Sequence, residues 1–573
     1  MMSNSQSPDK VFPADLLIVG GGIAGLTSAI TAKETVPELE VLIVDKATAS
    51  KGWAGKAART AGLLSFVTPE DDPEEFVKYC LSHIGYFLND QVLLREFAYA
   101  SMQMGERLSS WGVEVLRDQN GKIQYAKWPF PWGTTGIDPD MCVQMANYAK
   151  SLGVKFIDKM VVAELLNDGN RVSGAVGFSL LNGGYSIFKA RAVILASGSQ
   201  NYDITPVWCS TGNGVAAAYR AGAEMRNAEF GNMCDFARVD PKTGWIYYGG
   251  HGGAHTAHDV LYSAKGEHIS QKYRPGMHSS MDPIAALAWY KETLAGNGPI
   301  YADLELFKSE GGQFFKFHPK ALERLSCIAM KVPPKAKKFE VVPGFIGELS
   351  CVKVDHQMAT SIAGLYAVGD VSGGGSARGG AAPTPPAKIH GTGILNALFM
   401  GMKAGPAAGI YARALKEWRI EPKVDDDQVK EIKERAYVPL TRKDGLSPRE
   451  IIHKIQDVVA PVDYSLIKSQ ERMEEALKHV MKIQQELDKM KAKDYHELAK
   501  CIDAESMALG AEMFYRASLM RTESRGFHYR EDYPEMDNKK WLKWIILKNV
   551  NAEMKLYTED IPIHKYPYNP VNV

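Results

Sequence analysis

The chain has 573 residues, 45% of them hydrophobic and 23% charged, which is ordinary for a soluble globular protein of about three to four domains. Lysine plus arginine and aspartate plus glutamate number 67 each, so zero net charge gives no indication of nucleic-acid or anionic-membrane binding. The seven cysteines stand singly without a CxxC pair, which argues against a disulfide scaffold, a zinc site or an iron–sulfur cluster in this chain. The polar N-terminus and the lack of a long apolar run predict a cytoplasmic protein with no membrane span.

The first motif lies at a predicted strand-to-helix turn near the N-terminus. Residues 15–19 read as a buried strand and 23–34 as a helix, and Gly20-Gly21-Gly22-Ile23-Ala24-Gly25 fits G-x-G-x-x-G. Glycines there let the backbone approach a pyrophosphate, which the N–H groups and positive dipole end of the helix bind. A second apolar strand, EVLIVDK, ends in Asp45, twenty residues after Gly25, where a carboxylate is expected to meet a ribose hydroxyl. The pattern predicts a dinucleotide site.

Two distant segments indicate that the dinucleotide is FAD rather than NAD. The stretch YSIFKARAVILASGS reads as a buried strand ending at Ser197-Gly198, and IAGLYAVGDVSGGG reads as another strand that closes on Gly369-Asp370. These segments resemble the two-dinucleotide-binding-domain flavoproteins, in which such a Gly-Asp pair lies beside the ribityl chain and pyrophosphate of FAD. In a classical NAD dehydrogenase, a segment this far along the chain is not expected to contribute to the nucleotide site.

The C-terminal stretch RTESRGFHYREDYPEMDNKKWLKW, residues 521–544, narrows the family. It resembles the matching segment of fumarate reductase and succinate dehydrogenase flavoprotein subunits, whose superfamily includes the FAD-carrying alpha subunit of adenylylsulfate reductase. VWCSTGNGVAAAYRAGAEM, GNGPIYADL at 296–304 and the helix-rich residues 425–520 agree with this resemblance. In outline, the chain is most similar to the alpha chain of adenylylsulfate reductase.

The resemblance implies an α/β fold with a discontinuous two-dinucleotide-binding-type FAD domain, an α+β capping domain and a C-terminal helical domain. The expected bounds are 10–235 and 341–415 for the two parts of the FAD-binding domain, 236–340 for the capping and substrate domain, and 425–573 for the helical domain. Residues 466–500 support the last of these, because their apolar positions recur at helical spacing among alternating charges.

The motifs and the resemblance together assign the contacts to FAD. The expected residues are Gly20, Gly22, Gly25, Asp45, Lys46, Gly62, Val162, Ser197, Gly198, Gly369 and Asp370. Family members with histidyl-FAD carry a histidine where GWAGKAARTAG has glycine or alanine, so we expect non-covalent FAD. No resident metal is predicted, and iron–sulfur clusters are expected only on a partner subunit.

The substrate-defining positions depart from fumarate reductases. The arginine that donates a proton there is expected at or beside Met281, and methionine cannot transfer a proton, while Arg274 is out of register. The HPTG segment of fumarate reductases has no good counterpart in this chain, where residues 234–239 read CDFARV. The His-Gly-Ala-Asn-Arg motif is missing from GGGSARGGAAP. These departures argue against fumarate or succinate as the substrate.

Adenylylsulfate reductase resembles the chain more closely at two candidate catalytic residues, Trp208 and Arg238, and Arg378 is a third candidate on other grounds. Trp208 stands before STGNG as a tryptophan near the flavin does there, and Arg238 in FARVD matches a substrate-site arginine. Arg378, in a glycine-rich loop near the flavin by family geometry, suits an anion or substrate clamp because of its planar donor fork. The match breaks at Val67, where that family has a flavin-side asparagine. A packing role for Trp208 and a surface salt bridge for Arg238 are the alternatives.

Three histidines within GGHGGAHTAH, residues 249–258, lie in the expected capping segment. His251 and His255 are the leading candidates for proton donors near neutral pH, while Asp259 could hold His258. The glycines oppose the fixed geometry that a metal needs, so a substrate loop is favoured over a metal site, with solvent-exposed histidines as the alternative. The aromatic segment KWPFPWGTTG, 127–136, fits either a wall for a planar substrate or a packed loop.

Three functions follow from these observations. The first is the FAD-bearing catalytic subunit of a soluble oxidoreductase that exchanges electrons with an iron–sulfur, ferredoxin-like partner and acts on a small-molecule substrate. The second is a self-contained, fumarate-reductase-like flavoenzyme acting on a carbon–carbon double bond. The third, a flavin-holding assembly subunit without catalysis, is disfavoured because the nucleotide motifs are intact. Dependence on a partner discriminates the first from the second.

Overall fold

A mostly parallel sheet of buried apolar strands organises the body of the molecule. Its order is β6-β2-β1-β9-β8-β7, and β16 also pairs with β9. The computed structural model describes residues 10–59, 62–128, 130–204, 209–240, 245–247, 261–273, 283–303, 318–321, 338–373 and 392–571. The strands of this sheet are β1 (Lys10–Val19), β2 (Val41–Val44), β6 (Lys155–Ile157), β7 (Met160–Asn167), β8 (Val172–Ser179), β9 (Tyr185–Leu195) and β16 (Leu365–Ala367).

The parallel part of the sheet confirms the strands predicted around the nucleotide motifs. β1, β2, β9 and β16 run in the same direction, whereas β8 and β7 form an antiparallel extension. β16 pairs with the end of β9, at Val193–Leu195, and β8 pairs with its beginning. The carboxyl ends of these parallel strands therefore meet at one edge of the sheet.

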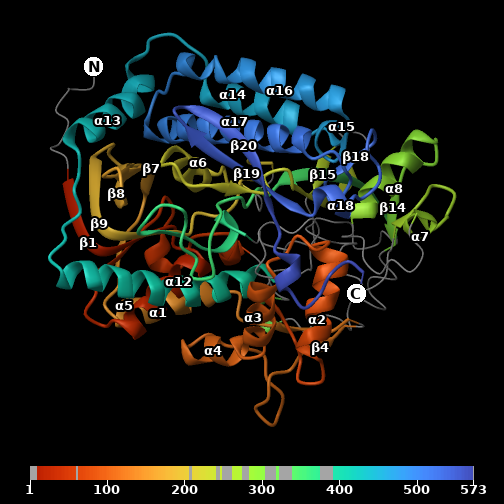
Figure 1. The fold of residues 1–573 in the computed structure, drawn as a ribbon, viewed down its shortest axis with the longest axis horizontal. Coiled ribbons are helices and arrows are strands. Elements are labelled where there is room, and N and C mark those ends of the chain that lie inside the picture. Colours follow the sequence, from red (N-terminus) through yellow and green to blue (C-terminus); the bar gives the residue numbers. More distant parts are fainter. Residues whose placement is uncertain are drawn as a thin grey trace.

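Two long helices cover one face of this sheet. α1 (Ile23–Thr35) and α12 (Thr392–Glu417) cross closely because α12 presents Gly401 and Gly405 to α1. A Cβ on Gly405 would lie 2.1 Å from the Thr31 hydroxyl oxygen, so only glycine permits this distance. Figure 1 shows α12 along the lower edge of the body with α1 and α5 beside it. The other helices and strands of this half are β3 (Leu63–Phe66), α2 (Pro73–Tyr79), the π-helix Cys80–Ile84, α3 (Gln91–Ser101), α4 (Met104–Ser110), β4 (Ala126–Lys127), β5 (Gly133–Gly136), α5 (Met141–Ser151) and α6 (Asn213–Arg220).

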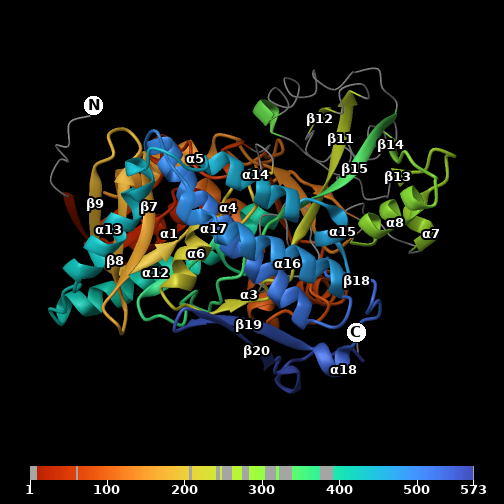
Figure 2. The same ribbon diagram turned by 90° about the horizontal axis from the view of Figure 1, so that it is seen from above.

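A second sheet forms a lobe that projects from the body, at the upper right of Figure 2. Its order is β12-β11-β15-β14-β13, and two short helices accompany it. We call these elements the outer lobe: β11 (Asn232–Asp240), β12 (Trp245–Tyr247), β13 (Leu261–Tyr262), α7 (Ile269–Tyr273), α8 (Pro283–Leu294), β14 (Tyr301–Asp303) and β15 (Lys338–Gly347). β11 leads from the body into the lobe and β15 leads back, and the two pair antiparallel from Asn232 and Gly347 onward.

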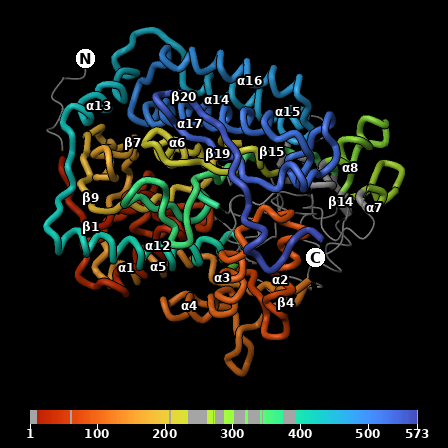
Figure 3. Tube along the Cα trace, viewed as in Figure 1, coloured from red at the N-terminus to blue at the C-terminus, as the bar shows by residue number. Residues whose placement is uncertain are grey.

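The C-terminal part is helical up to Met520, as predicted. Its helices are α13 (Asp426–Thr441), α14 (Pro448–Val459), α15 (Val462–Ser465), α16 (Gln470–Gln484) and α17 (Tyr495–Met520). In α14 the Ser447 side chain accepts from the Glu450 N–H while the Glu450 side chain accepts from the Ser447 N–H, a capping box that fixes where the helix starts. Figure 3 shows these helices along the upper side of the body, α13 in teal at the left and the others in blue. Within the described residues, no helix is both long and apolar enough to cross a membrane.

Beyond Met520 the chain returns to the body as strands, which the sequence pattern did not reveal. β19 (Lys543–Val550) lies between β10 (Met225–Arg226) and β20 (Glu553–Asp560) in a three-stranded sheet. The remaining short elements are β17 (Ile467–Lys468), β18 (Tyr529–Arg530) and α18 (Asn538–Trp541). The C-terminal segment therefore packs against the chain just before it enters the outer lobe.

A buried ion network fixes this return. The Arg521 guanidinium donates to Glu229 at 2.8 Å and to Glu523 at 2.9 Å, and all three side chains are fully buried. Arg521 also donates to the backbone oxygens of Trp541 and Lys543. Because Glu229 precedes β11 by only three residues, the network anchors the entry to the outer lobe.

Replacing Arg521 with methionine leaves two fully buried carboxylates without this guanidinium, so we expect the free energy of unfolding to fall by about 3–5 kcal/mol. The matched control is Arg95→Met, which removes a half-exposed pair with Glu74 and should cost less than about 1 kcal/mol. Urea-unfolding curves of both variants provide the measurement. Equal midpoints for the two variants would contradict a structural role for the network.

Candidate active site

The glycine turn between β1 and α1 has the close contacts that its sequence predicts. Gly20 has a φ of +108°, and a Cβ on it would lie 2.4 Å from the Ala196 carbonyl oxygen. A Cβ on Gly25 would lie 2.0 Å from the Gly20 carbonyl oxygen. At Gly22, by contrast, the closest atom to such a Cβ is the Cα of Gly55 at 3.5 Å. Gly20 and Gly25 thus serve packing, and Gly22 leaves the space that a phosphate needs at the N-terminus of α1.

Asp45 lies against this turn at the end of β2. Its carboxylate accepts from the Gly21 N–H at 2.7 Å and from the Ala47 N–H at 2.6 Å. Burial raises the pKa of this carboxyl above its ordinary value of 3.8, and the two backbone donors oppose that rise. The carboxylate is therefore fixed in orientation, at the place where the motif predicts a contact with ribose.

The ends of β9 and β16 reach the same place. Gly20 touches Ala196, which Ser197 and Gly198 follow directly. Gly369, with a φ of +68°, approaches α1 so closely that a Cβ on it would lie 2.8 Å from the Ala24 Cβ. The structure thus brings together the three segments that were assigned to FAD from distant parts of the sequence.

The polar groups at this edge fit a large polar cofactor. Among the residues that the structure describes, the buried Ser197 Oγ has no hydrogen-bond partner, and neither the oxygen nor the nitrogen of the buried Asn396 amide has one. Buried polar atoms are usually paired, so Ser197 Oγ, next to the Ala196 carbonyl that Gly20 contacts, fits a site for a polar ligand. FAD offers hydroxyl, phosphate and ring groups that would supply a hydrogen-bond partner.

Three further predicted FAD residues lie around this edge. Lys46 Nζ is 3.6 Å from Asp503 of α17, and this carboxylate raises the pKa of Lys46. Val162 lies on β7 next to a bulge, two residues beyond Met160, whose N–H donates to the Asp45 carbonyl. Gly62 has a φ of +63° and accepts from the Ile137 N–H at 2.7 Å. Their contacts to FAD remain predictions.

Most of the predicted catalytic residues lie outside the described residues. These are Trp208, His251, His255 and Arg378, together with His258, Arg274 and Met281. Arg238 is placed by its backbone on β11, paired with Ile246 of β12. It therefore belongs to the outer lobe, six residues beyond the point where β11 leaves the body.

The sequence interpretation missed Lys56, Asn396 and Glu348. Lys56 Nζ donates to Ser199 at 2.9 Å and to the predicted FAD residue Asp370 at 3.1 Å, and Glu348 Oε1 lies 3.6 Å away. One signal was present, since Lys56 directly follows Gly55, in the segment compared with the histidyl-FAD position. Nothing in the sequence around Asn396 or Glu348 pointed to them.

The aromatic segment around Trp128 and Trp132 is largely packed. The two indoles are 7% and 5% exposed, and the Trp128 Nε1–H donates to the Thr134 hydroxyl at 2.9 Å. Phe130 stacks on Trp132 with ring centroids 4.9 Å apart. These contacts favour the packed-loop interpretation of this segment.

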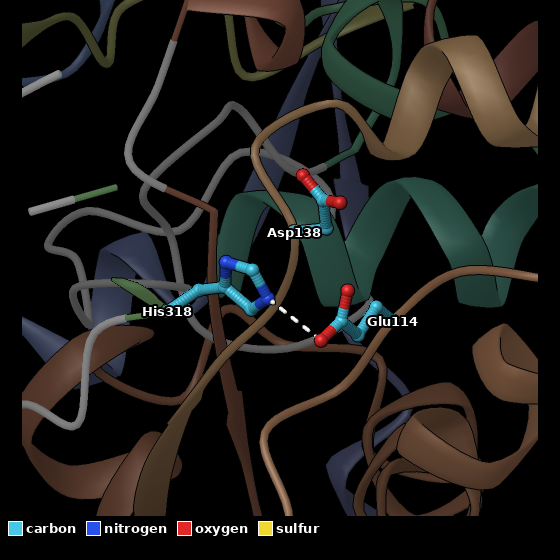
Figure 4. Close-up of side chains that lie close together, drawn as sticks. All are labelled: Glu114, Asp138 and His318. Atoms are coloured by element: carbon cyan, nitrogen blue, oxygen red, sulfur yellow. Dashed lines mark ion pairs between the residues drawn. The ribbon is translucent and has the colours of Figure 1, made fainter. Parts of the chain in front are cut away.

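Glu114, Asp138 and His318 form a second cluster, with candidate ligand atoms within 4.8 Å of one another. Figure 4 shows His318 facing Glu114, 3.3 Å from Nε2 to Oε1, with Asp138 beside them. The Lys320 ammonium, however, donates to the buried Asp138 carboxylate at 2.5 Å. Because a cation already neutralises this carboxylate, we assign no metal here.

The fold and the site together define a flavoprotein of the two-dinucleotide-binding-domain class. The family description "FAD binding domain" matches residues 15–234, and "Fumarate reductase flavoprotein C-term" matches residues 455–572. The chain belongs to the fumarate reductase/succinate dehydrogenase flavoprotein superfamily and is an FAD-dependent oxidoreductase.

Curated relatives match over nearly the whole chain. A subunit of the fumarate reductase (CoM/CoB) of Methanothermobacter marburgensis is 25% identical over 94% of this chain and 97% of its own length. An uncharacterized FAD-dependent oxidoreductase of Methanocaldococcus jannaschii is 28% identical, covering 93% of this chain and 96% of its own length.

Solved structures confirm the fold. E. coli quinol fumarate reductase matches with a TM-score of 0.80 at 19% identity, over 97% of this chain and 98% of the other. Adenylylsulfate reductase of Archaeoglobus fulgidus matches with a TM-score of 0.74 at 20% identity, over 98% of both chains. The expected similarity to adenylylsulfate reductase is therefore present, beside an equally extensive one to fumarate reductase.

Asp45 should make the affinity for FAD depend on pH. Because burial raises the pKa of Asp45 in the FAD-free protein and ribose hydroxyls would stabilise the carboxylate, FAD binding should release a proton. The affinity for FAD should then increase as the pH rises from the ordinary aspartate range to the raised pKa of Asp45, and level off above it. Fluorescence titration of the FAD-free protein with FAD at a series of pH values measures this dependence.

Asp45→Asn is the control for that titration. It should bind FAD more weakly, by about tenfold or more, because an acceptor of charge-assisted hydrogen bonds is lost. Its affinity should no longer change over the same pH range. A wild-type affinity that is flat with pH would contradict the role assigned to Asp45.

Proposed function

We propose that the chain is the FAD-bearing catalytic subunit of an oxidoreductase that exchanges electrons with a separate iron–sulfur subunit. The observation that carries this proposal is the meeting of the Gly20–Gly25 turn, Asp45 and Asp370 at one sheet edge, where Lys56 links Asp370 to Glu348 directly after β15. FAD bound there would supply transfer of an electron pair to or from a substrate.

The chain's own residues would hold and orient the cofactor. The N-terminus of α1 would bind the pyrophosphate, with Gly22 allowing close approach. Asp45 would accept from ribose hydroxyls, and Asp370 would lie beside the ribityl chain, as the resemblance implies. The segment GWAGKAARTAG, which carries glycine or alanine where histidyl-FAD relatives have their histidine, supports non-covalent binding.

The outer lobe would act as the capping domain over the flavin. It is joined to the body by β11 and β15, and β11 carries Arg238. An arginine in this position would bind an anionic substrate through two parallel N–H donors. Residues 236–340 are the proposed capping domain, with 10–235 and 341–415 as the FAD-binding domain and 425–573 as the C-terminal domain.

The relatives support a partner. The Methanothermobacter protein is named as one subunit of a fumarate reductase, and others are named flavoprotein subunits. This chain has no CxxC pair, so clusters that relay electrons would lie on another chain. A self-contained, fumarate-reductase-like flavoenzyme acting on a carbon–carbon double bond is the second candidate, and relatives whose names carry no subunit, such as the L-aspartate oxidase of Pseudomonas aeruginosa, favour a self-contained enzyme.

Native purification from the source cells, without dissociating any complex, tests the partner. We expect a second, small chain on a denaturing gel and the broad visible absorption of iron–sulfur clusters under the flavin bands. Flavin bands with a single chain would contradict the two-subunit proposal and favour the self-contained enzyme. In the first case the assay is oxidation of sulfite in the presence of AMP, with an added artificial acceptor that takes up the electron pair. In the second case it is reduction of unsaturated acids by reduced viologen.

Replacing Arg238 with alanine should reduce turnover in the active assay by about a hundredfold or more while FAD stays bound, since a donor to the substrate is lost. Arg117→Ala, which removes a partly exposed ion pair with Glu106, is the control and should keep wild-type turnover. Full activity in Arg238→Ala would refute the assignment of this residue.

A further inference from the structure

A buried polar network connects the FAD-side acid Asp370 to the base of the outer lobe, which we define as Asn232 and residues 346–348. At its centre is Lys56, whose side chain is 12% exposed. The ammonium lies 3.1 Å from Asp370 Oδ2 and 3.6 Å from Glu348 Oε1. One nitrogen thus lies between two carboxylates, one of them fully buried.

Glu348 extends the network to β11. Its second carboxylate oxygen accepts from the Asn232 side-chain amide, and Asn232 is the first residue of β11. Both side chains are fully buried. Glu348 itself follows β15 directly, so this single carboxylate joins the strand that enters the lobe, the strand that leaves it and Lys56.

A second branch reaches β15 through Ser199. Its hydroxyl accepts from Lys56 and donates to Asn201 Oδ1 at 2.8 Å. The Asn201 amide nitrogen in turn donates to the Ile346 carbonyl of β15, also at 2.8 Å. Lys56 therefore contacts the base of the lobe by two routes that share no other residue.

The backbone at the base is bent by a tight turn. Gly347 and Glu348 have φ values of +68° and +65°, and the second of these is unusual for a residue with a side chain. A backbone held in this region needs surrounding contacts that fix it. The Glu348 N–H donates to the Gln200 carbonyl, and the carboxylate contacts Lys56 and Asn232.

Lysine suits this position chemically. Its ammonium group has three donors on a compact charge, and three acceptors surround it, on Ser199, Asp370 and Glu348. Without the ammonium, the two carboxylates would face each other with the Glu348 charge buried and uncompensated. The residue before Lys56 also contacts the glycine turn between β1 and α1, since a Cβ on Gly55 would lie 3.0 Å from the Gly22 Cα.

We propose that Lys56 is a positioning residue that holds the base of the outer lobe in register with the FAD-side acid Asp370. It acts through Glu348 and Ser199 and makes no contact with substrate. In this way the strand that carries Arg238 keeps a fixed position relative to the residues proposed to bind FAD. The inference rests on the proposed FAD site but needs no assumption about the substrate or the iron–sulfur partner.

Hydrogen–deuterium exchange of the FAD-loaded protein tests the proposal. In Lys56→Met, exchange should accelerate by about tenfold or more in β11 and β15, because a charge-assisted contact to both strands is lost. Exchange in β19 and β20 should stay at the wild-type rate. Lys56→Arg, which keeps the cation, should restore protection to within about twofold of the wild type.

Glu348→Gln keeps the shape of the side chain and leaves Asp370 and Lys56 in place. It should loosen the same two strands while FAD stays bound, and it decides the question if Lys56→Met does not fold. In the double variant the two effects should be clearly less than multiplicative, because both residues act in one network. The control Lys403→Met removes an ion pair between α12 and Glu96 and should leave both strands unchanged.

Three results would overturn the proposal. The first is exchange at the wild-type rate in β11 and β15 of FAD-loaded Glu348→Gln. The second is acceleration that is equally large in β19 and β20. The third is a double variant in which the effects of the two substitutions multiply. Failure of the proposed FAD site would be seen separately. In that case the absorption spectrum of the wild-type protein would show no flavin, before any exchange is measured.

Discussion

The contact between the glycine turn and the end of β9 is the constraint that determines the geometry of the site. The Cβ position of Gly20 lies 2.4 Å from the Ala196 carbonyl, and that of Gly25 lies 2.0 Å from the Gly20 carbonyl. Any larger side chain at either position would separate α1 from the sheet. Because α1 approaches this closely, its N-terminus, Asp45 and the loop after β16 share one edge, and α12 can pack on α1 through its own glycines.

The outer lobe depends on a different kind of contact. Two strands join it to the body, and the buried groups at their base are polar rather than apolar. Polar contacts fix direction, because hydrogen bonds require particular distances and angles. The Arg521–Glu229 pair fixes the chain just before β11, and Lys56 and Glu348 fix the point where β15 ends. The proposed substrate-binding role of Arg238 on β11 would need such a defined base.

Local sequence signals predicted the strands and helices around the nucleotide motifs, since hydrophobic runs and glycine spacing are local properties. The C-terminal resemblance correctly placed the chain in its superfamily. The roles of Lys56 and Glu348 could not be predicted, because each depends on contacts with residues more than a hundred positions away. The strand β19 was missed for the same reason, as its partner β10 lies far upstream, and β20 joins this sheet by pairing with β19. The candidate catalytic residues Trp208, His251, His255 and Arg378 remain predictions.

Non-covalent binding of FAD at this edge of the sheet underlies every role proposed for the residues around it. It is measured by the absorption spectrum of the natively purified protein, recorded before and after acid precipitation. We predict flavin bands in the native protein and full recovery of the flavin in the supernatant, at about one equivalent per chain, since a single dinucleotide motif is present. A colourless protein, or flavin that stays with the precipitate, would contradict this binding mode.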